Sequence, residues 1–432
     1  MKIPNELDRR VAPVITDAVH FDIRLKPYDH FLLDNGIPVY TIPSSNQETM
    51  MVELSFDAGN WYEGRKLAAT AVNHLMKNGT ESHTALQLSE MVEYYGAFLD
   101  SSCHHEHGNY ALHSLTRHIG ELLPLLREII TTPVFPQEEL DLYRQNMKQQ
   151  LAVNLRKCDF VANRKIDECL FGTSHPYGSF SSMEAYDALN RESLVQFYRS
   201  HYTFDRCRIF AAGQLPPDFA LQLNRHFGKD SWNGPSSSVR PTHNLLPAGQ
   251  RSYRIQNDPE GVQGAVRMGR LFPNRFHPDF PGMRVLNTIF GGYFGSRLMS
   301  NIREEKGFTY GIHSHLYNCR EQSAITIQTE AGREVCESTL TEIYKEMNRI
   351  RQEPVEEEEL HLVRNYLMGS VLGDLDGPFQ LIQRWRDLIL NGLDETYFNK
   401  NIETVRTITA EELLVLARKY FVAEEWYELI VI

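Results

Sequence analysis

The feature that most constrains this chain is an internal repeat with an offset of about 220 residues. Segment 139–145 (ELDLYRQ) resembles 359–365 (ELHLVRN), and a proline precedes each of them. Two more pairs keep the same order at nearly the same offset: 192–212 with 411–432, and Tyr95-Gly96 with Tyr310-Gly311. One pair of amphipathic helices can match by chance, but three ordered pairs indicate a duplicated chain.

The length of the chain agrees with two copies of one unit. At 432 residues it exceeds what a single hydrophobic core usually supports, so each copy can bury a core of its own. The stretch 228–245 is rich in Gly, Ser, Pro and Asn and falls between the copies. The sequence therefore predicts two similar halves, 1–230 and 245–432, joined by a linker at 228–245.

Within each half, strand-like segments precede long helical ones. Segment 31–42 has the pattern of a hairpin with Asn-Gly at its turn, and 51–56 alternates as a half-buried strand does. Helical periodicity begins after Pro136. The matching helix after Pro354 opens with the carboxylates Glu356–Glu359, which the helix dipole favours in a first turn. Each half is therefore predicted to be α+β, an antiparallel-rich sheet packed with helices.

Charge and cysteine usage narrow the possible partners. The formal net charge of −12 gives no electrostatic support to nucleic-acid binding, so no nucleic-acid partner is expected. The sequence has neither the apolar core of a signal peptide nor an apolar run of about 18 residues, so we expect no membrane span. Six scattered cysteines without a CxxC pair suit free, mostly buried thiols. These features together predict a cytoplasmic protein.

One segment of the second half carries a family resemblance. Residues 290–310 (FGGYFGSRLMSNIREEKGFTY) combine a glycine-rich turn, Ser-Arg-Leu and Arg-Glu-x-x-Gly-x-x-Tyr. This pattern resembles the second-half signature of the pitrilysin/insulinase-type peptidases, which include the mitochondrial processing peptidase. The loop 172–178 (GTSHPYG) is similar to a His-Pro-containing loop of the same family. The resemblance spans nearly the whole chain and implies two homologous halves that form one shell of a clam-like peptidase.

Active members of that family carry an inverted zinc motif, HxxEH, near the start of the first half. The anchor Lys77-Asn-Gly-Thr80 places this motif on Thr70-Ala-Val-Asn73-His74, so that only the second histidine is kept. The resemblance places the third zinc ligand, a carboxylate in the family, at Gln150. Catalytic zinc needs three protein ligands, and Asn73 cannot act as a base, so we expect no metal on this chain.

The family motif in the second half is intact. By resemblance, Arg303 and Tyr310 would hydrogen-bond the backbone of a peptide substrate and stabilise the oxyanion. In the two-subunit members of the family one chain carries zinc and the other is degenerate. The resemblance therefore implies a non-catalytic subunit that contributes Arg303 and Tyr310, binds an extended peptide, and pairs with a homologous HxxEH-bearing subunit holding the zinc. Outside the motif, Arg303 could pair with Glu304 or Glu305, and Tyr310 could be a core aromatic residue.

Two other interpretations stay open. A self-sufficient metallopeptidase could use a rearranged site made of His74 and the cluster Cys103–His107, where Cys103, His105 and His107 would share one face if the segment were a strand. A purely structural or peptide-binding protein would need no catalytic partner. The glycines Gly291, Gly292 and Gly295 do not match a phosphate-binding loop, and we expect them to allow close backbone approach.

Overall fold

The computed structural model describes residues 16–45, 47–235 and 239–432, and its strands form two sheets. The six-stranded first sheet has the order β1-β2-β6-β3-β5-β4, and the five-stranded second sheet has the order β7-β11-β8-β10-β9. The strands of the first sheet are β1 Asp29–Leu32, β2 Pro38–Pro43, β3 Thr49–Phe56, β4 Phe98–Cys103, β5 Gly108–Leu115 and β6 Cys207–Gly213. Those of the second are β7 Ser252–Ile255, β8 Gln263–Phe272, β9 Thr309–Tyr317, β10 Ser323–Gly332 and β11 Tyr427–Val431.

The two sheets share one topology. In each sheet a parallel pair, β2 with β6 or β7 with β11, is followed by strands that all pair antiparallel. The order β2-β6-β3-β5-β4 therefore corresponds strand by strand to β7-β11-β8-β10-β9. The predicted α+β architecture of two similar halves is confirmed.

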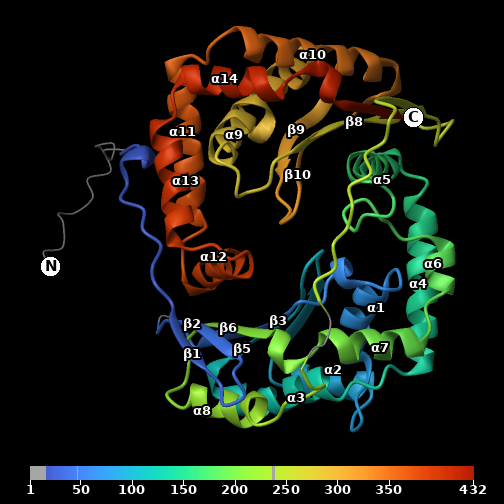
Figure 1. Cartoon of the computed structure of the whole chain (residues 1–432), viewed down its shortest axis with the longest axis vertical. Helices are drawn as coiled ribbons and strands as arrows, with labels where there is room; N and C mark the ends of the chain where they lie inside the picture. Colours follow the sequence, from blue (N-terminus) through green and yellow to red (C-terminus); the bar gives the residue numbers. More distant parts are fainter. Residues whose placement is uncertain (1–15, 46, 236–238) are drawn as a thin grey trace, which may run out of the picture.

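Helices enclose the sheets and connect the two halves. Those of the first half are α1 Ala68–Leu75, α2 Ala85–Tyr94, α3 Ile119–Thr131, α4 Gln137–Asn154, α5 Cys158–Phe171, α6 Met183–Asp187, α7 Arg191–His201 and α8 Phe219–Leu223. Those of the second are α9 Phe280–Asn287, α10 Cys336–Gln352, α11 Glu357–Gly373, α12 Pro378–Leu390, α13 Glu395–Thr407 and α14 Ala410–Tyr420. In Figure 1 the sheets lie toward opposite ends of the long axis, with α4 and α6 along one side and α11 and α13 along the other.

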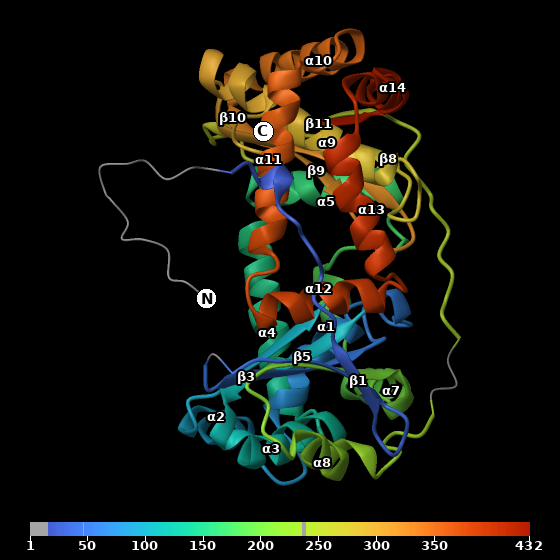
Figure 2. The ribbon, with the colours of Figure 1, turned by 90° about the vertical axis from the view of Figure 1, so that its left-hand side faces the viewer.

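The helices predicted after the two prolines are both present. Leu140, Tyr143 and Leu151 are buried on α4, as the periodicity predicted, while Met147 is half-buried. Helix α11 begins at Glu357 and has Glu357, Glu358 and Glu359 in its first turn. From Lys229 onward, the described part of 228–245 has no helix or β-strand. In Figure 2 it forms an extended connection between the two halves.

Each half lends one helix to the sheet of the other half. Helix α5 packs on β8 and β11 of the second sheet, whereas α12 packs on β2 and β6 of the first. The two helices start at Cys158 and Pro378, which differ by the repeat offset, so the exchange is reciprocal. Each hydrophobic core accordingly mixes the halves: Leu429 joins the first core, and Phe210 joins the second. This exchange fixes the two sheets relative to each other.

The exchange corrects one prediction. Segment 51–56 was expected to be half-buried, but every residue of β3 from Met50 to Phe56 is buried. The prediction was wrong because β3 is central in its sheet and the reciprocal exchange places α12 over a face that one half by itself would leave in water. Glu53, on that face, is neutralised by Arg386 of α12.

Two further expectations concern the whole chain. All six cysteines are free, and four of them, Cys169, Cys207, Cys319 and Cys336, are buried. Across the described ranges, no helix has both the length and the apolar character needed to cross a bilayer.

Candidate functional site

Helix α1 carries the segment that aligns with the zinc motif, and Glu63 fixes its first turn. The Glu63 carboxylate accepts the backbone N–H groups of Leu67 at 3.0 Å and Ala69 at 2.9 Å. Leu67 precedes the helix in the left-handed region with φ of 69°. Burial raises the pKa of Glu63 to about 7, against the opposing effect of its backbone hydrogen bonds. Glu63 therefore acts as an anchor for the helix start.

Thr70 and His74 lie one helical turn apart on the exposed face of α1. The His74 ring lies against Tyr143 of α4, with ring centroids 5.0 Å apart. Desolvation of the ring, followed by the charge of Lys77, lowers the pKa of His74, while the charge of Glu139 acts in the opposite direction. Its imidazole is therefore neutral at pH 7, a state that could ligate a metal, but Thr70 offers only a hydroxyl beside it.

Asn73 points the other way, and its side chain is buried in the interior. Its Nδ2 donates to the carbonyl oxygen of Asn109 at 3.3 Å and to the Tyr202 hydroxyl at 3.1 Å. The backbone carbonyl of Asn73 accepts a hydrogen bond from the hydroxyl of Tyr110. At the position of the family's catalytic glutamate, this chain therefore has a buried amide with a structural function and no titratable group.

Gln150 completes the set of residues that align with zinc ligands. It is exposed on α4, seven residues after Tyr143, which corresponds to about 10 Å along a helix axis. Thr70, His74 and Gln150 provide one imidazole, one hydroxyl and one amide, and this donor set does not fit zinc. Among the residues the structure describes, no group of three His, Cys, Asp or Glu side chains could hold a metal ion.

The Cys103–His107 cluster does not form a rearranged site. Strand β4 ends at Cys103 and β5 begins at Gly108, so 104–107 is a hairpin loop closed by a hydrogen bond from His104 N to His107 O of 2.8 Å. The condition for a shared face, a continuous strand through 103–107, is not met because the chain reverses direction here. The side chains diverge toward separate partners: Cys103 to Thr70, His105 to Asn60 and Tyr317, and His107 to Asp57.

Arg303 and Tyr310 are brought together in the second half. Arg303 lies in a π-helical turn, Met299–Glu305, and Tyr310 lies near the start of the edge strand β9. Arg303 Nε donates to the backbone carbonyl oxygen of Tyr310 at 3.1 Å, and its guanidinium lies 4.7 Å from the ring centroid of Phe294. The ion pair of Arg303 with Glu304, at 3.7 Å, is long. These contacts fix the guanidinium beside the strand edge.

Tyr310 is free to contact a ligand. The residue is 94% exposed, so the alternative of a core aromatic residue was wrong. No hydrogen bond or ion pair between described residues joins the Arg303–Tyr310 pair to Thr70, Asn73 or His74. The chain therefore has two separate motif segments, one on each half.

The glycine-rich segment permits close packing at one position in particular. A Cβ on Gly291 would lie 2.7 Å from Ser314 Cβ and 2.9 Å from the Ser314 backbone nitrogen, closer than side chains approach. Gly291 and Gly292 lie at the end of a second π-helical turn, η7 (Thr288–Gly292), and a Cβ on Gly295 would meet only the Tyr293 ring. The predicted close backbone approach is present at Gly291, where η7 (Thr288–Gly292) meets β9.

Several residues that shape these sites were not found from the sequence. Glu63 and Tyr202 fix α1, and Phe294 supports Arg303. Glu63 lies just before the aligned motif, so a helix-capping carboxylate could have been suspected. Tyr202 is 129 positions from Asn73, and no local pattern links the two.

Comparison with known protein families gives two matches that together cover most of the chain. Residues 39–172 match the family model described as Insulinase (Peptidase family M16), and residues 188–367 match the one described as Peptidase M16 inactive domain. An uncharacterized zinc protease, YmxG, of Bacillus subtilis (strain 168) is 20% identical over 400 residues, covering 90% of this chain and 95% of the relative. Cytochrome b-c1 complex subunit 1, mitochondrial, of Bos taurus is 29% identical over 266 residues, covering 60% and 55%.

Solved structures share the fold. A peptidase M16 inactive domain from Pseudomonas fluorescens superposes with a TM-score of 0.82 at 20% identity, covering 94% of this chain and 98% of that one. A protease from Helicobacter pylori gives a TM-score of 0.85 at 16% identity, covering 94% and 99%. These likenesses establish the two-domain architecture.

Proposed function

This chain belongs to peptidase family M16, the insulinase family, and from that premise we propose that it is the non-catalytic, substrate-binding subunit of a heteromeric metallopeptidase. The contrast between its two motif segments carries the proposal. The helix aligned with the zinc motif keeps one imidazole, while Arg303 and Tyr310 are intact and accessible. A homologous subunit with an intact HxxEH would supply the zinc.

The contacts of Arg303 suit it to a peptide backbone. Its Nε is occupied by the Tyr310 carbonyl and its Nη1 faces Glu304, so Nη2 is left without a hydrogen bond among the described residues. A guanidinium that is already oriented loses little entropy when it donates to a substrate carbonyl. The Tyr310 hydroxyl, exposed nearby, is a second donor for a developing oxyanion.

Two free sheet edges suit an extended peptide. Strand β4 is the last strand of the first sheet, and β9, which carries Tyr310, is the last strand of the second. An added peptide strand would gain main-chain hydrogen bonds from either edge. The position of Tyr310 on β9 favours the edge of the second sheet for the residues around the scissile bond.

A mixed assay tests this proposal. The chain is purified with a relative that has an intact HxxEH, and cleavage of a fluorogenic peptide is followed. We expect no cleavage by this chain alone, and a fall in activity of about 100-fold for the pair when this chain carries Arg303→Ala or Tyr310→Phe. Tyr94→Phe, at another highly exposed tyrosine, is the matched control and should have no effect. Chelator-sensitive cleavage by the isolated chain would contradict the proposal.

A second candidate function is a scaffold without a catalytic partner. Similarity to a chain named as a subunit of the mitochondrial cytochrome b-c1 complex favours it. In the mixed assay a scaffold would assemble with its partner, but activity would not depend on Arg303 or Tyr310.

A further inference from the structure

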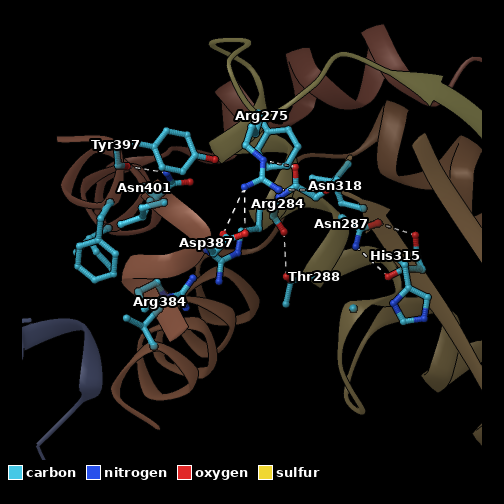
Figure 3. Close-up of a pocket in the computed structure, with 18 residues that line it drawn as sticks. Arg275, Arg284, Asn287, Thr288, His315, Asn318, Arg384, Asp387, Tyr397 and Asn401 are labelled. Carbon is cyan, nitrogen blue, oxygen red and sulfur yellow. Dashed lines mark hydrogen bonds and ion pairs between the residues drawn. The ribbon is translucent and has the colours of Figure 1, made fainter. Parts of the chain in front are cut away.

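A cavity of about 350 Å³ lies in the second half, away from both motif segments. Residues of α9, α11, α12, α13 and β9 line it, and neither Arg303 nor Tyr310 does (Figure 3). Three arginines line it, Arg275, Arg284 and Arg384, with a single lining carboxylate, Asp387. The charge of its lining is therefore positive, although the whole chain is acidic.

Two of the three arginines already have partners. Arg275 Nε donates to Asn318 Oδ1 at 3.0 Å, and its Nη1 lies 3.3 Å from Asp387. Arg384 Nη2 lies 2.5 Å from a carboxylate oxygen of Asp374. Both carboxylates are about half exposed, so each pair is in contact with solvent on one side.

Arg284 differs from both. Within the described ranges, its guanidinium makes no hydrogen bond and no ion pair, and the residue is half-buried on α9 where it lines the cavity. The Thr288 hydroxyl bonds the Arg284 backbone carbonyl and not the side chain. Burial, and then repulsion from Arg384, lowers the pKa of the Arg284 guanidinium. The charge of Asp374 acts in the opposite direction, but Asp374 is paired with Arg384, so a negatively charged ligand would supply the direct partner that Arg284 lacks.

Two amides of the cavity lining already have hydrogen-bond partners. The amide of Asn287 donates to the carbonyl of Ser314, and its oxygen accepts from the Ser314 hydroxyl. The Asn401 amide donates to the backbone of Tyr397. Among the described residues, Arg284 is the one lining arginine whose guanidinium has neither a hydrogen bond nor an ion pair, and its planar fork matches two oxygens that share a negative charge.

We propose that this cavity binds a small organic oxyanion. Arg284 donates two parallel hydrogen bonds to the phosphate or carboxylate group of this ligand. Arg384 and Arg275 add positive charge around the same group. The apolar side chains of Phe280, Leu388 and Phe398 line the remaining wall and would cover the carbon skeleton of the ligand. The volume lies at the lower end of the range for small-molecule sites. The proposal is independent of the peptidase-subunit role, because it uses none of the same residues.

Thermal unfolding with added anions tests the site. The full chain is melted with inorganic phosphate, with succinate, or with chloride at matched ionic strength. We expect a saturable rise in melting temperature with phosphate or succinate and none with chloride, and the anion that responds identifies the bound group. In Arg284→Met the response should vanish, and in Arg284→Lys, which keeps the charge but loses the fork, affinity should fall about 10-fold.

A control variant and a second measurement complete the test. Arg225→Met removes an exposed arginine from the first half and should leave the response unchanged. Arg284→Met should raise the melting temperature of the ligand-free protein by about 1–3 °C, because an unpaired charge is removed. Equal responses to all three salts, an unaltered response in Arg284→Met, or a lower melting temperature of that variant would overturn the proposal.

Discussion

The guanidinium of Arg386 holds the buried carboxylate of Glu53 across the boundary between the two halves. Its Nη1 lies 2.6 Å and 2.8 Å from the two carboxylate oxygens, and the Glu53 side chain is only 4% exposed. Arg386 lies on α12 of the second half, and Glu53 lies on β3 of the first. The ion pair therefore accompanies the helix exchange that joins the sheets.

Arg386→Met should destabilise the protein by about 2–4 kcal/mol, because Glu53 is left charged and unpaired in the interior. Urea unfolding measures the change. A second substitution, Glu53→Gln, should recover much of the loss, since it removes the stranded charge. Arg349→Met, which breaks an exposed pair with Glu353, is the control and should cost less than about 0.5 kcal/mol. If Arg386→Met and Arg349→Met lowered the free energy of unfolding by similar amounts, the argument would be contradicted.

Asp167 should make stability depend on pH. Burial, followed by the charge of Glu168, raises the pKa of Asp167 to about 7 in the folded protein. The folded state therefore keeps a proton that the unfolded chain releases above about pH 4, and the contribution of Asp167 to stability falls as the pH rises from about 4 to 7.

Asp167→Asn mimics the protonated carboxyl and isolates this effect. The free energy of unfolding of the variant, relative to the parent, should be near zero at pH 4 and favourable by up to about 4 kcal/mol at pH 8. Urea titrations across this range measure the difference. Glu63, His175 and His201 titrate in both proteins and cancel in the comparison. A difference that does not change with pH would refute the assignment.

Gly291 should not tolerate a side chain. Because a Cβ there would press against Ser314, Gly291→Ala should destabilise the protein by about 1–3 kcal/mol. Gly369, on α11, is the matched control: nothing lies within 4 Å of its Cβ position, so Gly369→Ala should stabilise by about 0.5–1 kcal/mol. Melting temperatures of the two variants should shift in opposite directions, and a shift of the same sign would contradict the packing argument.

His74 should make no difference to metal content. The purified chain should contain much less than one zinc per molecule, and His74→Ala should leave that value unchanged, because among the described residues no group of three potential ligands includes this imidazole. Elemental analysis after gel filtration measures it. A full equivalent of zinc that disappears in His74→Ala would show that a metal site has been assembled around this residue.

The sequence by itself determined the features that are local or repeated. The offset of about 220 residues predicted two similar halves, and the helices after Pro136 and Pro354 follow from side-chain periodicity. The family resemblance placed Thr70, Asn73 and His74 on one helix. Such features can be recognised in a sequence because neighbouring residues share one helix or strand, whose local geometry sets the spacing of their side chains.

Only the tertiary structure decided which surfaces meet. Helix α12 covers the face of the first sheet that carries Glu53, the chain reversal after Cys103 separates the histidines of the cluster, and a partner of Asn73 lies 129 residues away. The cavity around Arg284 likewise gathers residues from helices α9, α11, α12 and α13 and from strand β9. Contacts between distant segments leave no periodic trace in a single sequence, because burial and counter-charges are set by packing in three dimensions.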